Sequence, residues 1–430
     1  MALRGRLNVY YGWIVLALAF LIGFFSAGTN QGFGVFIKPM VDDFGWSRAD
    51  ISLSISIFAV MSAIIPPVAG RIADRYGPRS VLTVGVALNA LGMILMATAN
   101  SLLEIYLFYG VLIGAGFGFT GIAATTALLS RWFVRRRGLA FSIAATGLGA
   151  GQLLLAPLTT LVIIQFSWQT AFAAVGIASA VLAPLVFVLL KKRAPEQADG
   201  IGVPAAAAQP VGAPDCVTNE MIRQDMNVAW GSRSFWMLAS GFMACGFTIF
   251  FLTLHLVPLA TDAGISAQQA AIALGLTGGA SILANLGIAT FTDRVSRKYI
   301  LAGLYALRGV SILMLFNVSG VALLYASALL FGLSRANVAV VSASVIDHFG
   351  RRAVGSLVGA LFMYHQFFAA AGAFFGGLVY DSFGSYNIML IIAFAAMVSA
   401  TAASLFIREP ERRSDVEAAR DSLTPVAVHS

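Results

Sequence analysis

The chain has 430 residues, of which 59% are hydrophobic and only 11% are charged, and its mean hydropathy is +0.86. This balance excludes an ordinary soluble domain, in which about a quarter of the residues carry a charge. The formal net charge of +8 does not indicate a nucleic-acid partner, because all but two of the 27 Lys and Arg residues lie in loops between apolar segments. The partner that this composition predicts is the lipid bilayer.

About twelve apolar segments follow one another along the chain, each long enough to cross roughly 30 Å of hydrocarbon as an α-helix. The runs are continuous rather than alternating, which favours helices over strands, and a helix satisfies its own backbone polar groups in lipid. The sequence therefore predicts an all-α membrane protein. The expected spans are residues 10–35, 49–72, 79–99, 102–129, 138–164, 168–190, 234–260, 266–292, 299–318, 321–346, 353–379 and 385–407.

The basic residues orient these spans. Loops on the side of the amino terminus hold 23 Lys and Arg residues, whereas the opposite loops hold only Lys38 and Arg48. The positive-inside rule then predicts that both termini are cytoplasmic. The first span follows Arg4 and Arg6 and resembles a cleaved secretory signal, but its loss would break the repeat described below, so we expect it to be a retained helix.

A stretch rich in Pro, Gly and Ala divides the chain into halves. It begins KKRAPEQADGIGVPAAAAQPVG and has the composition of a flexible linker between six spans and six. Parallel halves with a site between them near the membrane midplane are the usual plan of a secondary transporter. We expect an N-terminal bundle (1–190), a cytoplasmic linker (191–233), a C-terminal bundle (234–407) and a cytoplasmic tail (408–430).

The two halves repeat a loop pattern. GRIADRYGPRSVL (70–82) follows the second span and ATFTDRVSRKYIL (289–301) follows the eighth, and each places Asp-Arg and further basic residues before the next helix. The first loop resembles the G-x-x-x-D-R-x-G-R motif of the major facilitator superfamily, at Gly70, Asp74, Arg75, Gly77 and Arg79. The resemblance implies two pseudo-symmetric bundles of six helices. It also implies a gating role at the cytoplasmic side for the charged residues Asp74, Arg75, Arg79, Asp293 and Arg294.

Finer features are similar to the monocarboxylate transporters and their bacterial relatives, which include oxalate/formate exchangers. The similar stretches are YYGWIVLALAF (10–20), GFGVFIKPMVDDFGWSRADIS (32–52), RWFVRRRGLA (131–140) and HLVPLATDAGIS (255–266). This resemblance implies a carrier in a bacterial inner membrane, and it places Lys38 where that family has a lysine implicated in anion entry. The Asp-x-x-x-Arg pair of animal members is missing from residues 273–291 of the eighth span, so proton-coupled lactate transport by that pair is not implied.

Two arginines, Arg308 and Arg335, lie well inside expected spans, whereas all 19 acidic residues lie in loops or at span ends. An Arg at the bilayer centre costs about 2.5–3.5 kcal/mol on insertion scales and is retained mostly where it meets water, a partner or a substrate. The superfamily resemblance places the tenth helix, and with it Arg335, beside the central cavity, where a guanidinium can bind a carboxylate at two points. The alternative is a structural bond to carbonyls or hydroxyls, and this is the favoured role of Arg308 on an outer helix.

Polar side chains of three other spans are further candidates for substrate binding. They are Asn30 and Gln31 in the first, His255 in the seventh, and Tyr364 and His365 in the eleventh; Thr120, Gln152 and Asn285 are weaker candidates. Asn30 and Gln31 can orient an anion or bond one helix to another. His255 can act as a gate residue, and His365 can carry a proton or be a buried, satisfied histidine. Tyr364, His365 and Gln366 are consecutive, so they cannot share one helix face.

The sequence offers no nucleotide-binding loop, metal-ligand cluster or nucleophile with its base, so neither an enzyme nor a cofactor is expected. The two cysteines, Cys216 and Cys245, give no disulfide framework. We therefore expect a secondary active transporter of small organic anions, first of all monocarboxylates, working by alternating access as a proton symporter or an anion exchanger. The alternatives are a carrier of another small solute, such as a drug or a sugar, and a membrane sensor that does not transport.

Overall fold

The structure is a computed structural model, and it describes residues 11–121, 124–125, 128–129, 132–133, 137–190, 219–291, 295–349 and 354–408. Two of the predicted gating residues, Asp293 and Arg294, lie outside the described residues. The side chains of Asp74 and Arg75 lie outside the description as well, although their backbone belongs to a helix.

All regular structure among the described residues is helical. The first half contains α1 (Gly12–Gln31), α2 (Gly34–Phe44), α3 (Arg48–Tyr76), α4 (Pro78–Met96), α5 (Leu102–Ile105), the π-helix η1 (Tyr106–Ile113), α6 (Gly114–Thr120), α8 (Arg137–Gln165) and α9 (Trp168–Leu189). The second half contains α10 (Asn219–Gly231), α11 (Arg233–Asp262), α12 (Ala267–Phe291), α13 (Arg297–Leu315), α14 (Val321–Leu333), the 3-10 turn η4 (Ser334–Ala336), α15 (Asn337–Phe349), α16 (Val354–Phe383) and α17 (Asn387–Leu405).

Eleven helical stretches of the described residues are long and apolar enough to cross a membrane. They coincide with eleven of the expected spans, and α1 with α2 makes the first one, so the predicted all-α membrane fold is confirmed. The first span is longer than predicted and interrupted, because α2 continues to Phe44 with a buried apolar face that packs against α11. Residues 219–231 of the predicted linker also form a helix, α10.

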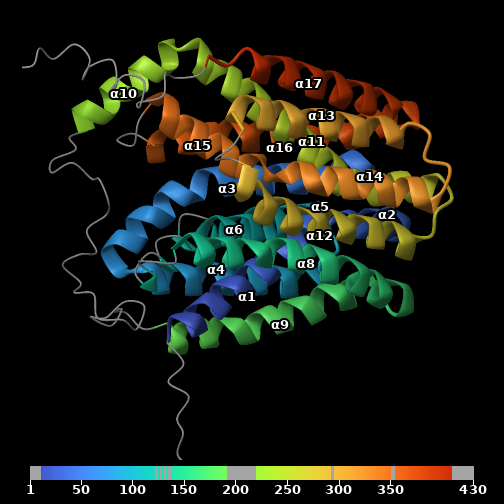
Figure 1. Ribbon diagram of the computed structural model, residues 1–430. Coiled ribbons are helices and arrows are strands. Elements are labelled where there is room, and N and C mark those ends of the chain that lie inside the picture. Colours follow the sequence, from blue (N-terminus) through green and yellow to red (C-terminus); the bar gives the residue numbers. More distant parts are fainter. Residues whose placement is uncertain are drawn as a thin grey trace, which may run out of the picture.

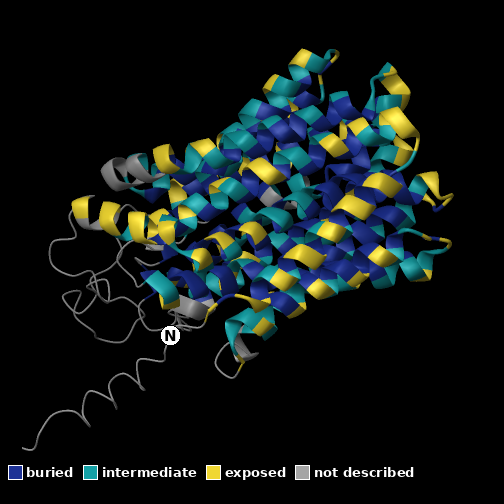
Figure 2. Ribbon diagram, turned by 90° about the horizontal axis from the view of Figure 1, so that it is seen from above, coloured by how far each residue is buried: buried dark blue, intermediate teal, exposed yellow. Residues whose placement is uncertain are grey.

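The helices gather into two bundles (Figure 1). Helices α1–α6, α8 and α9 belong to one bundle and α11–α17 to the other, and the boundary is formed by α3 against α16 and by α8 against α12. We call the end at which α9 finishes and α11 begins the linker end, and the end at which α2 and α11 finish the far end. Exposed residues follow the outer helices, whereas buried ones fill the interior (Figure 2).

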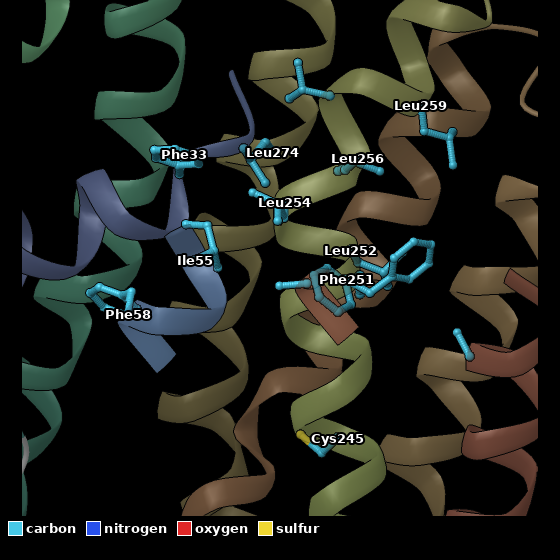
Figure 3. Close-up of a cluster of buried hydrophobic side chains, with 14 of the residues drawn as sticks. Phe33, Ile55, Phe58, Cys245, Phe251, Leu252, Leu254, Leu256, Leu259 and Leu274 are labelled. Atoms are coloured by element: carbon cyan, nitrogen blue, oxygen red, sulfur yellow. The ribbon is translucent and has the colours of Figure 1, made fainter. Parts of the chain in front are cut away.

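Apolar side chains close the space between the bundles toward the far end. Phe33, between α1 and α2, and Ile55 of α3 belong to the same buried cluster as Leu254 of α11 and Leu274 of α12 (Figure 3). The outer helices instead carry large exposed apolar side chains, such as Val188 at 70%. Since such a surface would aggregate in water, it indicates lipid as the surrounding medium.

Glycines permit the close approach of α8 and α12. A Cβ built on Gly278 would lie 2.6 Å from the carbonyl oxygen of Gly149, and a Cβ on Gly149 would lie 2.7 Å from that of Gly278. Both contacts are backbone contacts, so neither can be relieved by turning a side chain. Small residues at a helix interface are how membrane helices gain close packing.

We expect Gly278→Ala to destabilise the protein by about 1–3 kcal/mol, which is the usual cost of forcing an extra methyl group into a packed interface. The lowered melting temperature is measured by tryptophan fluorescence in detergent. Gly303→Ala is the matched control, because a Cβ at Gly303 of α13 meets no atom within 4 Å. Equal melting temperatures of the two variants would contradict the close packing of α8 on α12.

Candidate functional site

The first and the tenth span are both interrupted at their middle. The first is broken at Gly32 and Phe33, directly after Gln31. The tenth passes through the 3-10 turn η4, where the Ser334 hydroxyl donates to the carbonyl oxygen of Phe331 at 2.6 Å. A serine hydroxyl bonded back to the preceding turn is a recognised cause of helix bending. Discontinuous helices of this kind are typical of substrate sites in secondary transporters.

Arg335 lies in η4 and reaches across the boundary between the bundles. Its Nη1 donates to Oε1 of Gln152 on α8 at 2.7 Å, and its Nη2 donates to Oε1 of Gln31 at the end of α1. Gln152 in turn donates through Nε2 to the hydroxyl of Thr277 on α12 at 2.9 Å. The interruptions of both spans therefore meet at one polar cluster, which we call the central site: Gln31, Gln152, Thr277 and Arg335.

The charge of Arg335 is not compensated within the described part of the chain. No carboxylate there forms an ion pair with it, and both of its hydrogen-bond partners are neutral amides. Gln152 is fully buried, so water reaches this side of the contact poorly. Arg335 itself is partly buried, and a charge withdrawn from water without a counter-charge is costly, so an entering anion would relieve that cost. The guanidinium presents Nη1 and Nη2 to two separate oxygens, which is the arrangement that a single carboxylate can also satisfy.

Arg308 of α13 is completely buried and braces the same turn. Its Nε donates to the hydroxyl of Ser334 at 2.9 Å, and its Nη2 donates to the carbonyl oxygen of Ser334 at 3.1 Å. Its Nη1 lies 3.0 Å from Sγ of Cys245 on α11. These contacts match the bracing role expected for Arg308, and they hold the residue that directly precedes Arg335.

Two further candidates lie near the boundary without touching Arg335. Asn30 accepts a hydrogen bond from the hydroxyl of Tyr109 at 2.7 Å, within the first bundle. His365 is buried, and its Nδ1 lies 3.0 Å from Oε1 of Gln366. Gln366 donates through Nε2 to the hydroxyl of Ser62 on α3, which again joins the two bundles.

Tyr364 points elsewhere. Its ring centre lies 6.2 Å from that of Trp230 in α10 and 6.2 Å from that of Trp236 in α11. This aromatic group lies at the linker end, and the structure does not bring it to the central site. Consecutive positions on a helix diverge by about 100°, which separates Tyr364 from its buried neighbours.

The remaining candidates lie at the far end, around Arg48, which the sequence analysis treated only as a loop charge. Arg48 at the start of α3 donates to both oxygens of Asp262 on α11, at 2.7 and 2.9 Å, and to the hydroxyl of Tyr386 at 2.8 Å. Its guanidinium carbon lies 3.7 Å from the centre of the Tyr380 ring. The signal that could have identified Arg48 is its isolation, since only it and Lys38 are basic among the loops of this side.

A second carboxylate strengthens this contact. Asp381 of α16 accepts from the backbone N–H groups of Arg48 at 3.1 Å and Ala49 at 2.7 Å, so a residue of the second bundle caps the first turn of α3. An anion at a helix amino terminus stabilises it through the helix dipole and the free N–H groups. We call Arg48, Asp262, Asp381, Tyr380 and Tyr386 the far-end lock.

Lys38 and His255 adjoin the far-end lock rather than the central site. Nζ of Lys38 lies 3.9 Å from Asp262, and the Lys38 side chain is 44% exposed. His255 is buried, with Nδ1 3.2 Å from the Tyr386 hydroxyl and Nε2 3.0 Å from the carbonyl oxygen of Ala373. Burial raises the pKa of the Tyr386 hydroxyl above its ordinary value, so Tyr386 remains neutral beside Arg48.

Of the predicted gating residues, only Arg79 has a described side chain, and its guanidinium carbon lies 4.2 Å from the ring centre of Phe187 in α9. A related ion pair occurs in the second bundle, where Arg297 at the start of α13 pairs with Asp347 of α15. Arg297 also donates to the carbonyl oxygen of Ala343 at 3.2 Å.

Comparisons with known proteins agree with this architecture. The family model described as the Major Facilitator Superfamily matches residues 19–284 and 236–429. An uncharacterized MFS-type transporter, YcxA of Bacillus subtilis, is 28% identical over 89% of this chain and 91% of its own length. Monocarboxylate transporter 11 of Mus musculus is 27% identical over 90% of this chain and 86% of its own, and human monocarboxylate transporter 12 is 25% identical over 90% and 78%.

Two solved structures share the fold. A bacterial homolog of the human lysosomal transporter Spinster, in an inward-facing and unoccupied conformation, superposes with a TM-score of 0.66 at 16% identity and covers 92% of this chain and 95% of its own. The nucleoside transporter NupG superposes with a TM-score of 0.71 at 14% identity and covers 92% and 100%.

Proposed function

Because this chain belongs to the major facilitator superfamily, we propose that it is a secondary active transporter of small organic anions, first of all monocarboxylates, and that Arg335 binds the carboxylate. Its relatives are transporters rather than enzymes, and several are monocarboxylate transporters. The observation that carries the anion proposal is the contact set of Arg335. A permanent cation between the bundles has, among the described residues, only the amide oxygens of Gln31 and Gln152 as hydrogen-bond acceptors.

Binding then proceeds by exchange of oxygens. The two carboxylate oxygens take the places of the two amide oxygens at Nη1 and Nη2, and a neutral contact becomes a charge-assisted one. The amide groups displaced from Arg335 still carry N–H donors, so Gln31 and Gln152 can donate hydrogen bonds to the bound carboxylate. Arg335 belongs to one bundle and the glutamines to the other. In the empty site direct Arg335–glutamine hydrogen bonds join the bundles, whereas in the occupied site the bound carboxylate joins them. Such differential binding is what couples a ligand to a conformational change.

The direction of access follows from the far-end lock. Its ion pair and backbone contacts hold the bundles together at the far end, and we infer from this that the substrate reaches the central site from the linker end. The positive-inside rule makes the linker end cytoplasmic, with both termini on that side of a bacterial inner membrane. Transport requires the lock to open and the linker end to close, as two bundles rock around one site.

Counterflow in proteoliposomes tests the proposal. Vesicles loaded with unlabelled lactate, pyruvate, acetate, formate or oxalate are diluted into the labelled acid, and we expect saturable exchange of at least one monocarboxylate. Drug and sugar substrates are assayed in parallel with the same vesicles. Exchange of a drug or sugar without any carboxylate, or no exchange at all, would overturn the assignment in favour of another carrier or of a sensor.

An internal anion should compete with the substrate. We expect Gln152→Glu to pair its new carboxylate with Arg335 and to weaken monocarboxylate binding by more than tenfold, which corresponds to about 1.4 kcal/mol. The near-isosteric change leaves the volume of the side chain unaltered, so the protein should retain or raise its melting temperature. Substrate-induced thermal shift and uptake are measured on the same preparation. Asn30→Asp is the control, because Asn30 bonds to Tyr109 and not to Arg335. If Gln152→Glu binds substrate normally, the carboxylate does not exchange with Gln152.

A further inference from the structure

A second polar cluster lies inside the second bundle, on the other side of η4 from the central site. Its members are Cys245 of α11, Tyr305 and Arg308 of α13, Ser334 of η4, Asn337 of α15 and His365 of α16, and all of them are buried. Figure 3 shows Cys245 lower on α11 than the apolar cluster around Leu254. Polar groups at this depth in a membrane bundle are costly and are retained mainly for function.

Cys245 is the centre of this cluster. Its Sγ is approached by two N–H donors, Nη1 of Arg308 at 3.0 Å and Nδ2 of Asn337 at 2.8 Å. A neutral thiol accepts hydrogen bonds weakly, whereas a thiolate beside a cation accepts them well. Within the described residues no carboxylate pairs with Arg308, and a thiolate at Cys245 is the group there that can compensate this fully buried cation.

His365 is the second titratable side chain of this cluster that the proposal uses. Oε1 of Gln366 is an acceptor, because the amide nitrogen of Gln366 donates to Ser62, so the hydrogen-bond network places a proton on Nδ1 of His365. Nε2 is buried without a hydrogen-bond partner, and the imidazole packs on α11 against Phe242 and Gly246, which lie on either side of Cys245 in the sequence. A buried polar atom without a partner calls for an explanation, and an exchangeable proton between Nε2 and Sγ provides one.

We propose that Cys245 and His365 form a proton-binding site and that Arg308 links it to the central site. A proton that enters on Nε2 passes to the thiolate: the N–H bond breaks, an S–H bond forms, and no electron is transferred. Without the proton, the negative charge of the thiolate and the positive charge of Arg308 cancel. With it, the cluster carries a net positive charge close to Arg335, which favours an anion there.

The mechanical link is short. Arg308 contacts both Sγ of Cys245 and two atoms of Ser334, the hydroxyl at 2.9 Å and the carbonyl oxygen at 3.1 Å. Ser334 directly precedes Arg335 in η4. When Cys245 is protonated, Arg308 loses the thiolate as its counter-ion. Arg308 also holds Ser334, so this loss changes the support of the turn that positions Arg335. This coupling rests on the proposed function in one respect, that Arg335 binds the substrate anion.

Other charged and titratable groups around the thiol are few. Tyr305 and Arg308 face it from α13, and Arg335 lies nearby in η4. The described side chains of α12 and α17 include no titratable group, and Asp347 and His348 of α15 lie in its last turn. The described groups of this cluster that can exchange a proton are therefore Cys245, His365 and Tyr305.

Thiolate absorbance tests the site directly. Cys216→Ser leaves Cys245 as the only cysteine, since the chain has two, and the far-ultraviolet absorbance of this protein is titrated against a Cys216→Ser/Cys245→Ser reference. We expect a thiolate band near neutral pH that disappears in one step on acidification, and a displaced midpoint when His365→Gln is added. Absence of the band at every pH where the protein is folded would overturn the proposal, as would a midpoint unaffected by His365→Gln.

Proton uptake tests the coupling. Lactate, or whichever acid counterflow identifies, is added to weakly buffered protein containing a pH indicator, and we expect proton uptake to saturate with anion binding in Cys216→Ser but not with Cys245→Ser or Cys245→Ala. A substrate-induced thermal shift is recorded on each sample. Anion binding without proton uptake would refute the coupling and leave the proposed function intact. A thiolate band in a protein that binds no carboxylate would refute the proposed function and leave the proton site.

Discussion

Arg335→Gln is expected to abolish saturable binding of the transported acid. A carboxylate held at two points by a guanidinium in a water-poor site gains roughly 1.5–3 kcal/mol for each charged hydrogen bond, and a neutral amide cannot replace that gain. Arg335→Lys keeps the charge but loses the planar fork, so we expect binding to weaken by about ten- to a hundredfold. Substrate-induced thermal shift and proteoliposome uptake are measured on the same purified variants.

A structural arginine would give the opposite result. Its loss would lower the melting temperature, and the surviving protein would bind the acid normally. Arg308→Gln is the useful comparison, because Arg308 is fully buried and braces Ser334, so it should lose stability rather than affinity alone. Normal binding by Arg335→Gln would remove the central site from the transport mechanism and leave only the fold.

Arg48→Ala should open the far end. The substitution removes the two contacts to Asp262 and the contact to Tyr386 together. Breaking a buried ion pair costs about 3–5 kcal/mol, and since Asp262 keeps a side-chain exposure of 26%, we expect the lower part of this range. A change of about 3 kcal/mol shifts the ratio of closed to open states by roughly a hundredfold. Transport should slow while equilibrium affinity for the substrate changes little.

Spin labels at Asn100 and Asn317 report this opening, because both residues are exposed and lie at the far end on different bundles. We expect Arg48→Ala to add a population with a longer distance between the labels. Lys38→Ala is the matched control, since its 3.9 Å contact with Asp262 is largely exposed and worth at most about 1 kcal/mol. Identical distance distributions in Arg48→Ala and the parent protein would show that the lock does not hold the far end closed.

Both experiments probe contacts between halves of the chain that are far apart in sequence. Gln31 and Arg335 are separated by 304 positions, and Arg48 and Asp262 by 214. The central site lies where the substrate is proposed to bind, and the far-end lock joins the two bundles at the far end. Substitutions at the two places should therefore have different signatures, a loss of affinity at Arg335 and a shift of conformation at Arg48.

The sequence alone determined the spans and identified Arg335 as a candidate for substrate binding. Each span carries its own apolar run, because every helix must satisfy the bilayer independently of its neighbours, and eleven of the expected spans appear as long apolar helices. Arg335 was identifiable because a cation in an apolar run is costly unless something pairs with it. The interruption at Gly32 and the full length of α2 were not predicted, since the packing of α2 on α11 holds residues 34–44 in a helix.

Only the tertiary structure shows which residues form hydrogen bonds and ion pairs with one another. Gln152 was a minor candidate and Arg48 only a loop charge until η4 was placed beside Gln152 and α11 beside Arg48, because hydropathy does not specify how a helix is rotated about its axis. The same holds for Cys245, which looked isolated in the sequence and lies between Arg308 and Asn337 in the structure. Hydrophobic length is a property of one segment, whereas a hydrogen bond between bundles depends on two segments whose mutual position is set by packing across the whole molecule.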